Sequence, residues 1–395
     1  MTPKPPSIPR DKVNNFTSEM MAKRQDFVAA QTGATPQHIS AATFDPATLP
    51  GNIENPIGAA QVPIGLAGPM LVRGEHIDGW VYVPMATTEG TLVASYSRGM
   101  SLLSKIGGIK VTVIERFMQR APVFHFPSAR EARVFGDWLR GNLAGVKAAA
   151  ETTTSRGKLS HVEHYGVARF WYTRFNFTTG DAAGQNMSGK AAQAACHWIM
   201  DNCPKDIRPD SYTLSGAIDT DKKHSQLNTL HSRGARVVVE ATIPRDALME
   251  IMRVETKDVY HMRRISMTGG MLAGTSNNGV HAANGIAAVY IATGQDAANV
   301  AESQAGITHV ELSENGDLYW SLTLPSLIVA SYGGGTGLAT QRECLEMMDC
   351  YGEGKALRLA EILGATVLAG EISLSSAVVG NYWVESHDAH GRNRP

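Results

Sequence analysis

The stretch PMATTEGTLVASYSRGM, from Pro84 to Met100, decides how the rest of the chain is interpreted. It places a single acid, Glu89, just before an apolar run that predicts a helix from about Glu89 to Ile106. A carboxylate at a helix start lies near backbone N–H groups that have no partner inside the helix. Taken alone, Glu89 is therefore either a general acid or an ordinary first-turn charge.

Three distant segments add further reactive groups: DKK at 221–223, GQDAA at 294–298 and ESH at 385–387. With Glu89 they supply acids, a lysine and a histidine, a set typical of acid–base chemistry on a carbonyl group. Each group also has an ordinary interpretation. Lys222 and Lys223 suit a surface cluster, Asp296 a solvated face of an alanine-rich helix, and His387 an inert terminal residue.

The bulk composition excludes several classes of protein. The 395 residues carry a formal net charge of −1, which gives no general attraction to nucleic acid or to anionic membranes. The four cysteines have no CxxC spacing, so neither a disulfide framework nor a structural zinc site is predicted. The N-terminus lacks the apolar region of a signal peptide, and no uninterrupted apolar run of ~20 residues is apparent. We therefore expect a cytoplasmic protein with no membrane segment.

The order of patterns predicts a mixed α/β (α+β) fold. A helix is expected from Thr17 to Gln31, followed by turns and short strands over 47–85. Residues after 120 alternate strand and helix, with a strand from Ala168 to Thr178 and a helix starting near Asp181, as in a small inserted α+β domain. Further helices are expected over 281–304 and over 357–383.

Two segments are candidates for binding phosphate groups. GDAAGQNMSGK, at 180–190, leads through small residues into a helix, and free N–H groups at such a start can hold a pyrophosphate. TTSRGK, at 153–158, adds hydroxyl groups, Arg156 and Lys158, although a solvated basic turn is the simpler interpretation. Neither segment is a GxGxxG turn, so a Rossmann domain is not predicted.

Taken together, the motifs resemble the hydroxymethylglutaryl-CoA (HMG-CoA) reductase family, and several of them look closer to its class I branch. PMATTEG, TDKK, HAAN, YIATGQDAA and the ESH tail occur in the family's order, from Glu54 to Arg392. The resemblance implies an oxidoreductase of the mevalonate pathway of isoprenoid biosynthesis. It would reduce HMG-CoA to mevalonate and CoA with two hydrides from NADPH, through mevaldyl-CoA and mevaldehyde.

The resemblance also implies roles for individual residues. Lys222 would stabilise the oxyanion, Asp296 would orient Lys222, Glu89 would protonate the aldehyde oxygen, and His387 would protonate the CoA sulfur. The remaining matched positions are Arg120, Ser215, Lys223, Arg264 and Asn284 for the substrate carboxylate, Ser95 and Arg98 near CoA, and Ser155, Arg156, Asp181, Gly184, Asn186 and Met187 for NADPH. Arg264 stands where the family commonly has lysine, and Ala183, Gln185 and Ser97 also depart from the usual residues.

The family's architecture is a large domain around a central helix, with an inserted small ferredoxin-like cofactor-binding domain. Applied to this chain, it divides the sequence into an N-terminal arm (1–53), a large domain (54–120 and 215–395) and the small domain (121–214). It also implies an obligate homodimer with sites shared between subunits.

Two other functions stay open at this point. One is the reverse reaction, an NAD-dependent degradation of mevalonate, against which Ser155 and Arg156 argue. The other is a non-catalytic CoA-binding protein, against which the full set of four catalytic residues argues.

Overall fold

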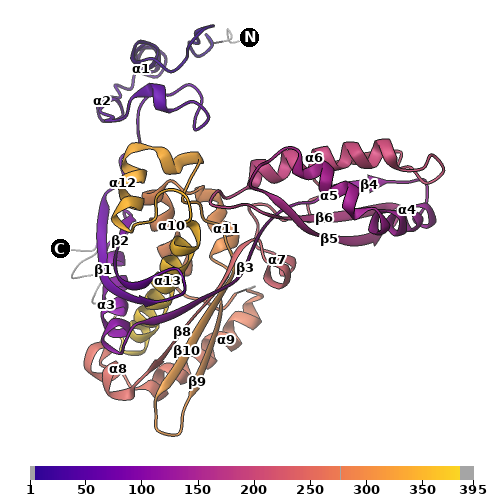
Figure 1. The fold of residues 1–395 in the computed structure, drawn as a ribbon. Coiled ribbons are helices and arrows are strands. Elements are labelled where there is room, and N and C mark those ends of the chain that lie inside the picture. The colour runs from indigo at the N-terminus through magenta and orange to yellow at the C-terminus, as the bar shows by residue number, and fades with distance from the viewer. Residues whose placement is uncertain (1–4, 276, 383–395) are drawn as a thin grey trace.

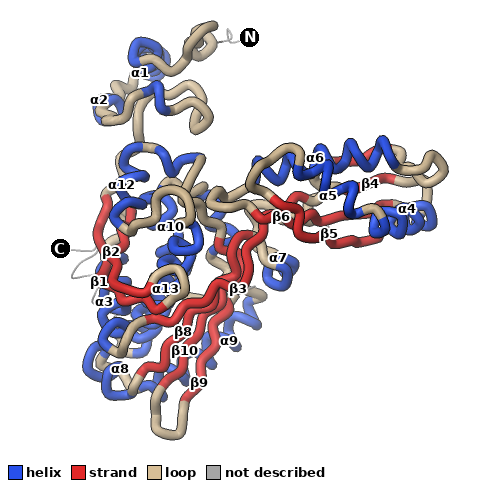
Figure 2. Tube along the Cα trace, viewed as in Figure 1, coloured by secondary structure: helices blue, strands red, loops and turns tan. Residues whose placement is uncertain are grey.

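The computed structural model describes residues 5–275 and 277–382, and it confirms the predicted mixed α/β fold (Figures 1 and 2). The helices are α1 (Ser18–Thr32), α2 (Gln37–Ser40), η1 (Pro46–Thr48), α3 (Leu92–Lys105), α4 (Ala129–Gly141), α5 (Leu143–Glu151), α6 (Gln185–Asn202), α7 (Gln226–His231), α8 (Arg245–Met252), α9 (Thr256–Ala273), α10 (Ala282–Thr293), η2 (Ala297–Asn299), α11 (Val300–Ser303), η3 (Gly334–Gly337), α12 (Ala339–Met347) and α13 (Ala356–Val379). The strands are β1 (Ile64–Arg73), β2 (Asp78–Ala86), β3 (Ile109–Arg120), β4 (Val123–His125), β5 (Lys158–Val167), β6 (Phe170–Thr178), β7 (Ser211–Thr213), β8 (Gly234–Ile243), β9 (Ile307–Leu312) and β10 (Leu318–Leu327).

The strands join in one continuous path with the order β7-β4-β6-β3-β8-β10-β9. β1 and β2 form a hairpin that joins β3 through a short parallel pairing, and β5 pairs with β6. Every other pairing within the described residues is antiparallel.

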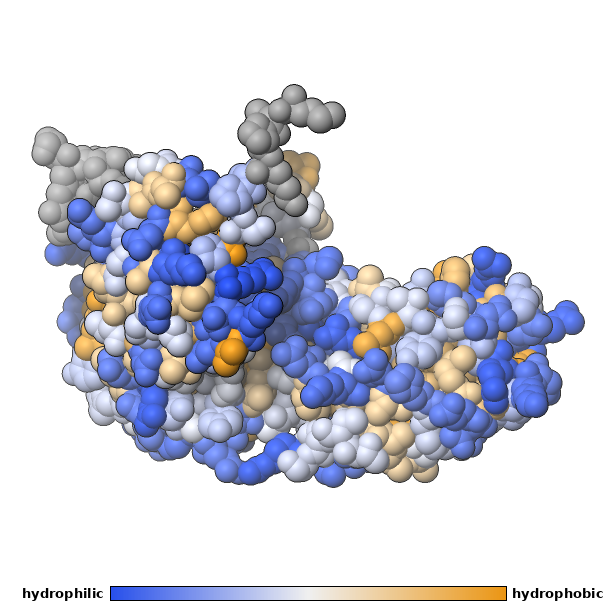
Figure 3. All heavy atoms as spheres, turned by 90° about the horizontal axis from the view of Figure 1, so that it is seen from above, coloured by the Kyte–Doolittle hydropathy of each residue, from blue (hydrophilic) through white to orange (hydrophobic). Residues whose placement is uncertain are grey.

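Strand β3 belongs to both halves of the molecule (Figure 1). Its residues 110–117 pair with β8, whereas Met118 to Arg120 pair with β6. Each half has its own hydrophobic cluster. One is built around α3, α10, α13 and the β8–β10 strands, and the other around α4, α5, α6 and β6. Two separate cores support the predicted insertion of 121–214, whose boundaries stay a proposal. Seen from above, the insertion projects as a lobe with a mostly polar surface (Figure 3).

Helix α13 is the central helix of the large domain. It packs against α3, α10 and β8, and most of its residues are buried. Among the described residues it is the one helix of sufficient length and apolar character to cross a membrane, with a mean hydropathy of 1.7, and 83% of that window is buried. The sequence predicted this helix over 357–383, and Arg358, Glu361 and Glu371 interrupt its apolar run. Its burial makes it the core of the large domain.

Close contact between α3 and α13 depends on small residues. A Cβ on Gly99 would lie 1.9 Å from the carbonyl oxygen of Ala369, so only glycine allows this approach. Tyr96 lies against Gly370 and Gly285, fully buried, and its hydroxyl donates to the carbonyl of His281 at 2.6 Å. The second half of the opening stretch, from Leu92, therefore begins the helix against which two other core helices pack.

Two buried carboxylates on α13 bind backbone N–H groups. Glu361 accepts hydrogen bonds from the N–H groups of Glu75, His76 and Ile77 in the β1–β2 turn, at 2.9–3.0 Å. Glu371 accepts from Val280, His281 and Ala282 at the start of α10. Buried carboxylates are costly without partners, and here the free donors of a turn and of a helix start supply them.

Three predicted elements need correction. The helix expected over 281–304 ends at Thr293 and is followed by η2 and α11. The helix expected from Glu89 begins at Leu92. Residues 47–85 contain two long strands, because Gly68 and Pro69 lie at a register shift of β1 that tolerates proline. In contrast, the first helix is confirmed, with Thr17 as its cap and Gly33 in the left-handed conformation after it.

Candidate active site

Lys222 and Asp296 form an ion pair at the junction of the two halves. The Lys222 Nζ atom lies 2.8 Å from Asp296 Oδ2, and the two side chains are 45% and 41% exposed. The hydrogen bond to Asp296 raises the pKa of Lys222, against the opposite effect of partial burial. A protonated lysine, held by a carboxylate yet open to solvent, can donate to an oxygen that gains negative charge.

Asp296 is held by the turn that ends α10. Gly294 takes a left-handed conformation with φ of 69°, and a Cβ there would lie 2.3 Å from the carbonyl oxygen of Gly335. The chain therefore leaves the helix at this glycine, and Asp296 becomes the cap of η2 instead of a helix-face residue. Its Oδ1 accepts from the N–H of Ala298 at 3.0 Å, which leaves Oδ2 for Lys222.

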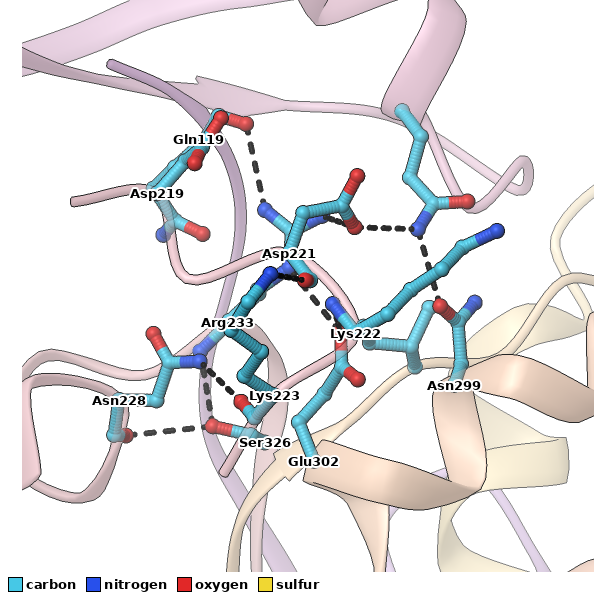
Figure 4. A network of polar contacts seen from close by, with 12 residues as sticks. Gln119, Asp219, Asp221, Lys222, Lys223, Asn228, Arg233, Asn299, Glu302 and Ser326 are labelled. Carbon is cyan, nitrogen blue, oxygen red and sulfur yellow. Dashed lines mark hydrogen bonds and ion pairs between the residues drawn. The ribbon is translucent and has the colours of Figure 1, made fainter. Parts of the chain in front are cut away.

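Lys222 lies in a loop held from below by buried charges (Figure 4). Its own φ of 56° is left-handed, a conformation that non-glycine residues adopt only when their surroundings impose it. The N–H of Lys222 donates to Glu302 Oε1 at 3.1 Å. The fully buried Arg233 donates to the same Oε1 at 3.2 Å and to Asp221 Oδ1 at 2.5 Å. Figure 4 shows the Lys222 side chain running away from Arg233, so the contacts of Arg233 and Glu302 fix the backbone and leave the ammonium to pair with Asp296.

The other two predicted catalytic residues are not joined to this pair. Glu89 is exposed in the segment before α3, where its N–H donates to the Thr87 hydroxyl at 3.0 Å. Within residues 5–275 and 277–382, no hydrogen bond or ion pair links Glu89 to Lys222 or Asp296. His387 lies outside the described residues.

A cavity of about 610 Å³ opens beside Asp296. Three predicted cofactor residues line it, namely Gly184, Asn186 and Met187. The glycine turn at Gly333 to Gly335 also lines it, and the N-terminal arm contributes Gly51 and Asn52. The structure thus brings part of the predicted cofactor set to the same cavity as one half of the ion pair.

The start of α6 suits a phosphate group. This helix has 18 residues, and within the described part of the chain no side chain caps its first turn. Its free N–H groups and the positive end of its dipole lie at the cavity wall. The residues present therefore fit a dinucleotide better than they fit a metal ion.

The remaining predicted cofactor residues have partners of their own. The Asp181 carboxylate accepts from the N–H groups of Gly354 and Ala356, at 2.8 and 3.2 Å, and so anchors the segment that leads into α13. Arg156 forms an exposed ion pair with Glu353 at 2.5 Å, which raises the pKa of the guanidinium. Ser155 is exposed beside it.

Two of the predicted substrate-carboxylate residues meet at one buried acid. Arg120 contacts Asp219 Oδ2 at 3.2 Å, and the Ser215 hydroxyl donates to the same oxygen at 3.2 Å. Lys223 is exposed and donates to the carbonyl of Asp221 at 3.1 Å. Arg120 and Ser215 therefore lie together, with Lys223 on the same loop as Lys222.

The other predicted substrate residues lie on core helices. Asn284 contacts His281 Nδ1 at 3.0 Å in the first turn of α10, and Arg264 is exposed on α9 over the ring of Tyr260. Ser95 and Arg98 both bind Ser373 of α13, at 3.1 Å between hydroxyls and at 2.7 Å from the guanidinium to the carbonyl. In this single chain, Ser95 and Arg98 hold α3 against α13.

Sequence reasoning missed the residues that support the ion pair. Arg233, Glu302 and Asn299 carried no motif, and Asp219 was overlooked beside Asp221. Gln185 was noticed only as a departure from the family's usual residue. That departure was the one available signal, because buried partners from distant segments leave no local pattern.

Comparison with known proteins identifies the family. The sequence model of hydroxymethylglutaryl-coenzyme A reductase matches residues 20–392. The chain belongs to the HMG-CoA reductase family. It is 40% identical to the 3-hydroxy-3-methylglutaryl-coenzyme A reductase of Methanocaldococcus jannaschii over 373 residues, which cover 93% of this chain and 92% of the relative. It is 38% identical to the enzyme of that name from Methanothermobacter thermautotrophicus, with coverage of 95% and 94%.

Solved structures share the reductase fold. A class II HMG-CoA reductase from Streptococcus pneumoniae, described as bound to NADPH in open conformations, matches with a TM-score of 0.66 and 20% identity, over 93% of this chain and 99% of that one. At this identity the likeness shows the fold alone. The comparisons show the family and not its branch, so the expectation of a class I-like chain stays a prediction.

Proposed function

We propose that this chain reduces HMG-CoA to mevalonate and CoA with two equivalents of NADPH, a step of the mevalonate pathway. The observation that carries the proposal is the 2.8 Å contact between Lys222 and Asp296 beside a cavity with an uncapped helix start. Membership in the HMG-CoA reductase family supports the reaction.

The chain's own residues supply donors and protons. Lys222 donates a hydrogen bond to the thioester oxygen, and later to the aldehyde oxygen, as each gains charge. Asp296 holds the ammonium and compensates its charge. Glu89 delivers a proton to the aldehyde oxygen, and His387 delivers one to the departing CoA sulfur, whose thiolate would otherwise attack the aldehyde again.

The cofactor is held by the start of α6. Gly184, Asn186 and Met187 line the cavity, and the free N–H groups of the first turn bind the pyrophosphate. The nicotinamide supplies the hydride for each reduction. Arg156 and Ser155 bind the 2′-phosphate, while Asp181 acts indirectly by fixing the segment next to α13.

The substrate's carboxylate is bound by cationic and amide donors. Arg120, Ser215 and Lys223 lie on or beside the Lys222 loop, and Asn284 and Arg264 come from α10 and α9. Ser95 and Arg98, which contact Ser373 of α13, are the residues assigned to CoA. Arg264 keeps the charge of the family's usual lysine but offers a planar, forked donor.

The functional unit in this proposal is a homodimer. Glu89 is exposed and separate from the ion pair, which a second copy can complete. Helix α9, which carries Arg264, also exposes apolar side chains, with Met271 80% and Leu272 90% exposed. Such neighbouring apolar residues are typical of a surface covered by a partner.

One observation favours an NAD-linked reaction, in either direction, as the second candidate. The carboxylate of Glu353 already occupies Arg156, the residue assigned to the 2′-phosphate. The 2′-phosphate of NADPH has to compete with that carboxylate for Arg156. NADH has no 2′-phosphate and avoids this competition, so the two cofactors should be compared.

The test is a spectrophotometric assay with purified protein and HMG-CoA. We expect two NADPH oxidised for each CoA thiol released, and a higher kcat/KM with NADPH than with NADH. No HMG-CoA-dependent oxidation of either cofactor would refute the reductase, and a clear NADH preference would refute the choice of cofactor.

A further inference from the structure

Gln185 joins three parts of the site that are far apart in the sequence. It is the first residue of α6 and lines the cavity proposed for the cofactor. Its Nε2 donates to Asp221 Oδ1 at 3.1 Å and to Asn299 Oδ1 at 3.0 Å. One amide thus bridges the small-domain helix to two segments of the large domain.

Both acceptors are directly connected to the ion pair. Asp221 is the residue before Lys222, and Asn299 ends the η2 turn that Asp296 caps. The N–H of Asn299 donates to the carbonyl of Asp296 at 2.9 Å, and Asn299 is only 1% exposed. A shift of the Gln185 amide therefore acts on both Lys222 and Asp296.

The backbone of Gln185 is also fixed. Its carbonyl accepts from Arg120 at 3.2 Å and from the Ser188 hydroxyl at 3.0 Å. Asp221 has a second donor, Arg233, so the loop stays anchored if the amide is lost. Arg233 therefore fixes where the Lys222 loop lies. Gln185 fixes how this loop is aligned with Asn299.

We propose that Gln185 is a positioning residue that aligns Lys222 with Asp296 and couples this alignment to the cofactor cavity. The role requires an amide, because a single NH₂ group donates to a carboxylate and to an amide oxygen at once. A methionine of similar length donates to neither, and a glutamate places a second carboxylate against Asp221. The inference rests on the proposed function where it is tested by enzyme activity. The test by chemical labelling of Lys222 does not depend on that function.

The experiment compares Gln185→Met with Gln193→Met, an exposed position on the same helix. Steady-state kinetics are measured with HMG-CoA and with mevaldehyde. In parallel, lysines are trace-acetylated, and mass spectrometry compares the acetylation rate of Lys222 with that of the exposed Lys110. We expect Gln185→Met to lower kcat about tenfold with both substrates, as misalignment of a catalytic group does. KM for HMG-CoA should stay within about twofold of the wild-type value, because the loop remains anchored by Arg233.

The acetylation rate of Lys222 would not change if Gln185 had a purely structural role. With the pair misaligned, Lys222 is deprotonated more often and should label at least about twofold faster, while labelling in Gln193→Met stays as in wild type. Wild-type kcat and labelling in Gln185→Met would overturn the proposal. A loss of activity that follows a lower Tm with unchanged Lys222 labelling would overturn it too.

Gln185→Glu provides a second test if the methionine variant folds poorly. Its kcat should lie below that of wild type at pH 7.5 and recover partly at pH 6, as one of the two facing carboxyls binds a proton. Wild-type activity for this variant would contradict the inference. A wild-type protein without HMG-CoA reductase activity would instead refute the proposed function, and the labelling comparison would still decide the role of Gln185.

Discussion

Two adjacent lysines, Lys222 and Lys223, have different surroundings although the sequence presents them as equals. Lys222 meets the Asp296 carboxylate, and its backbone is fixed by Glu302. Lys223 donates to a carbonyl of its own loop. In the proposed reaction, Lys222 would act on the reacting atoms and Lys223 would attract the substrate anion.

Replacing each lysine with alanine should separate these roles. Lys222→Ala removes the oxyanion donor, so kcat should fall by about 10²- to 10³-fold for HMG-CoA and for mevaldehyde alike. Lys223→Ala should mainly raise KM for HMG-CoA, since it removes binding common to substrate and transition state. Steady-state kinetics on both substrates measure this. Aldehyde reduction at the wild-type rate in Lys222→Ala would contradict the assigned role.

The pair between Arg156 and Glu353 gives a prediction about cofactor choice. Glu353→Gln frees the guanidinium, so KM for NADPH should fall by up to about fivefold, the range of an exposed ion pair. KM for NADH should not change, because NADH has no 2′-phosphate. Equal changes in both KM values would show that Glu353 does not compete with that phosphate. The exposed Glu314→Gln is the matched control.

Only some of the site residues could be predicted from the sequence. Motifs identified Lys222 and Asp296, because each lies in a short segment typical of the family. Arg233, Glu302 and Gln185 were missed, because their value comes from contacts between segments dozens of residues apart. Such contacts depend on the tertiary fold and leave no spacing in the sequence.

At the scale of elements, the start of α10 is a buried polar junction. The Glu371 carboxylate accepts its first N–H groups, and His281 lies beside it with 5% of its surface exposed. Burial lowers the pKa of His281 to about 4. The folded protein therefore keeps this imidazole neutral where an unfolded chain would protonate it.

This lowered pKa predicts acid sensitivity. The unfolded histidine binds a proton near pH 6.5 and the folded one only near pH 4, so the free energy of unfolding falls as the pH drops through that window. The loss for His281 is at most about 3 to 4 kcal/mol, since the pKa differs by about 2.5 between the two states. Urea denaturation at pH 7 and pH 5 should show a smaller decrease for His281→Gln than for wild type. The exposed His38→Gln should match wild type, and an equal decrease in all three proteins would exclude His281 as a source of the effect.

Elements with strong apolar periodicity were predicted correctly. The prediction was wrong where a helix ends at a glycine that contacts a distant segment. α3 and α13 follow from their apolar spacing and small residues. The end of α10 at Gly294 does not, because it depends on Gly335, which lies 41 positions further along the chain. Likewise, the proline in β1 suggested a turn, whereas the strand continues through a local register shift.

At the scale of the whole molecule, the proposed homodimer would bring Glu89 of one subunit to the Lys222–Asp296 pair of the other. Two inactive variants, Glu89→Gln and Lys222→Ala, should regain activity when mixed under conditions that exchange subunits. In a heterodimer one of the two shared sites is intact, so random exchange should restore about a quarter of the wild-type activity. Native mass spectrometry would confirm the exchange. Exchange without recovered activity would mean that both residues act within a single subunit.

Two connections join the small domain to the rest of the chain, and only one of them is a regular β-strand. Its entry is β3, a continuous strand shared by both sheets. Its exit, after β7, is the irregular segment that carries Ser215 and Lys222 before α7 begins. The entry is therefore held by the ladder hydrogen bonds of two neighbouring strands, whereas the exit relies on the side chains of Arg233 and Glu302 to keep Lys222 in place.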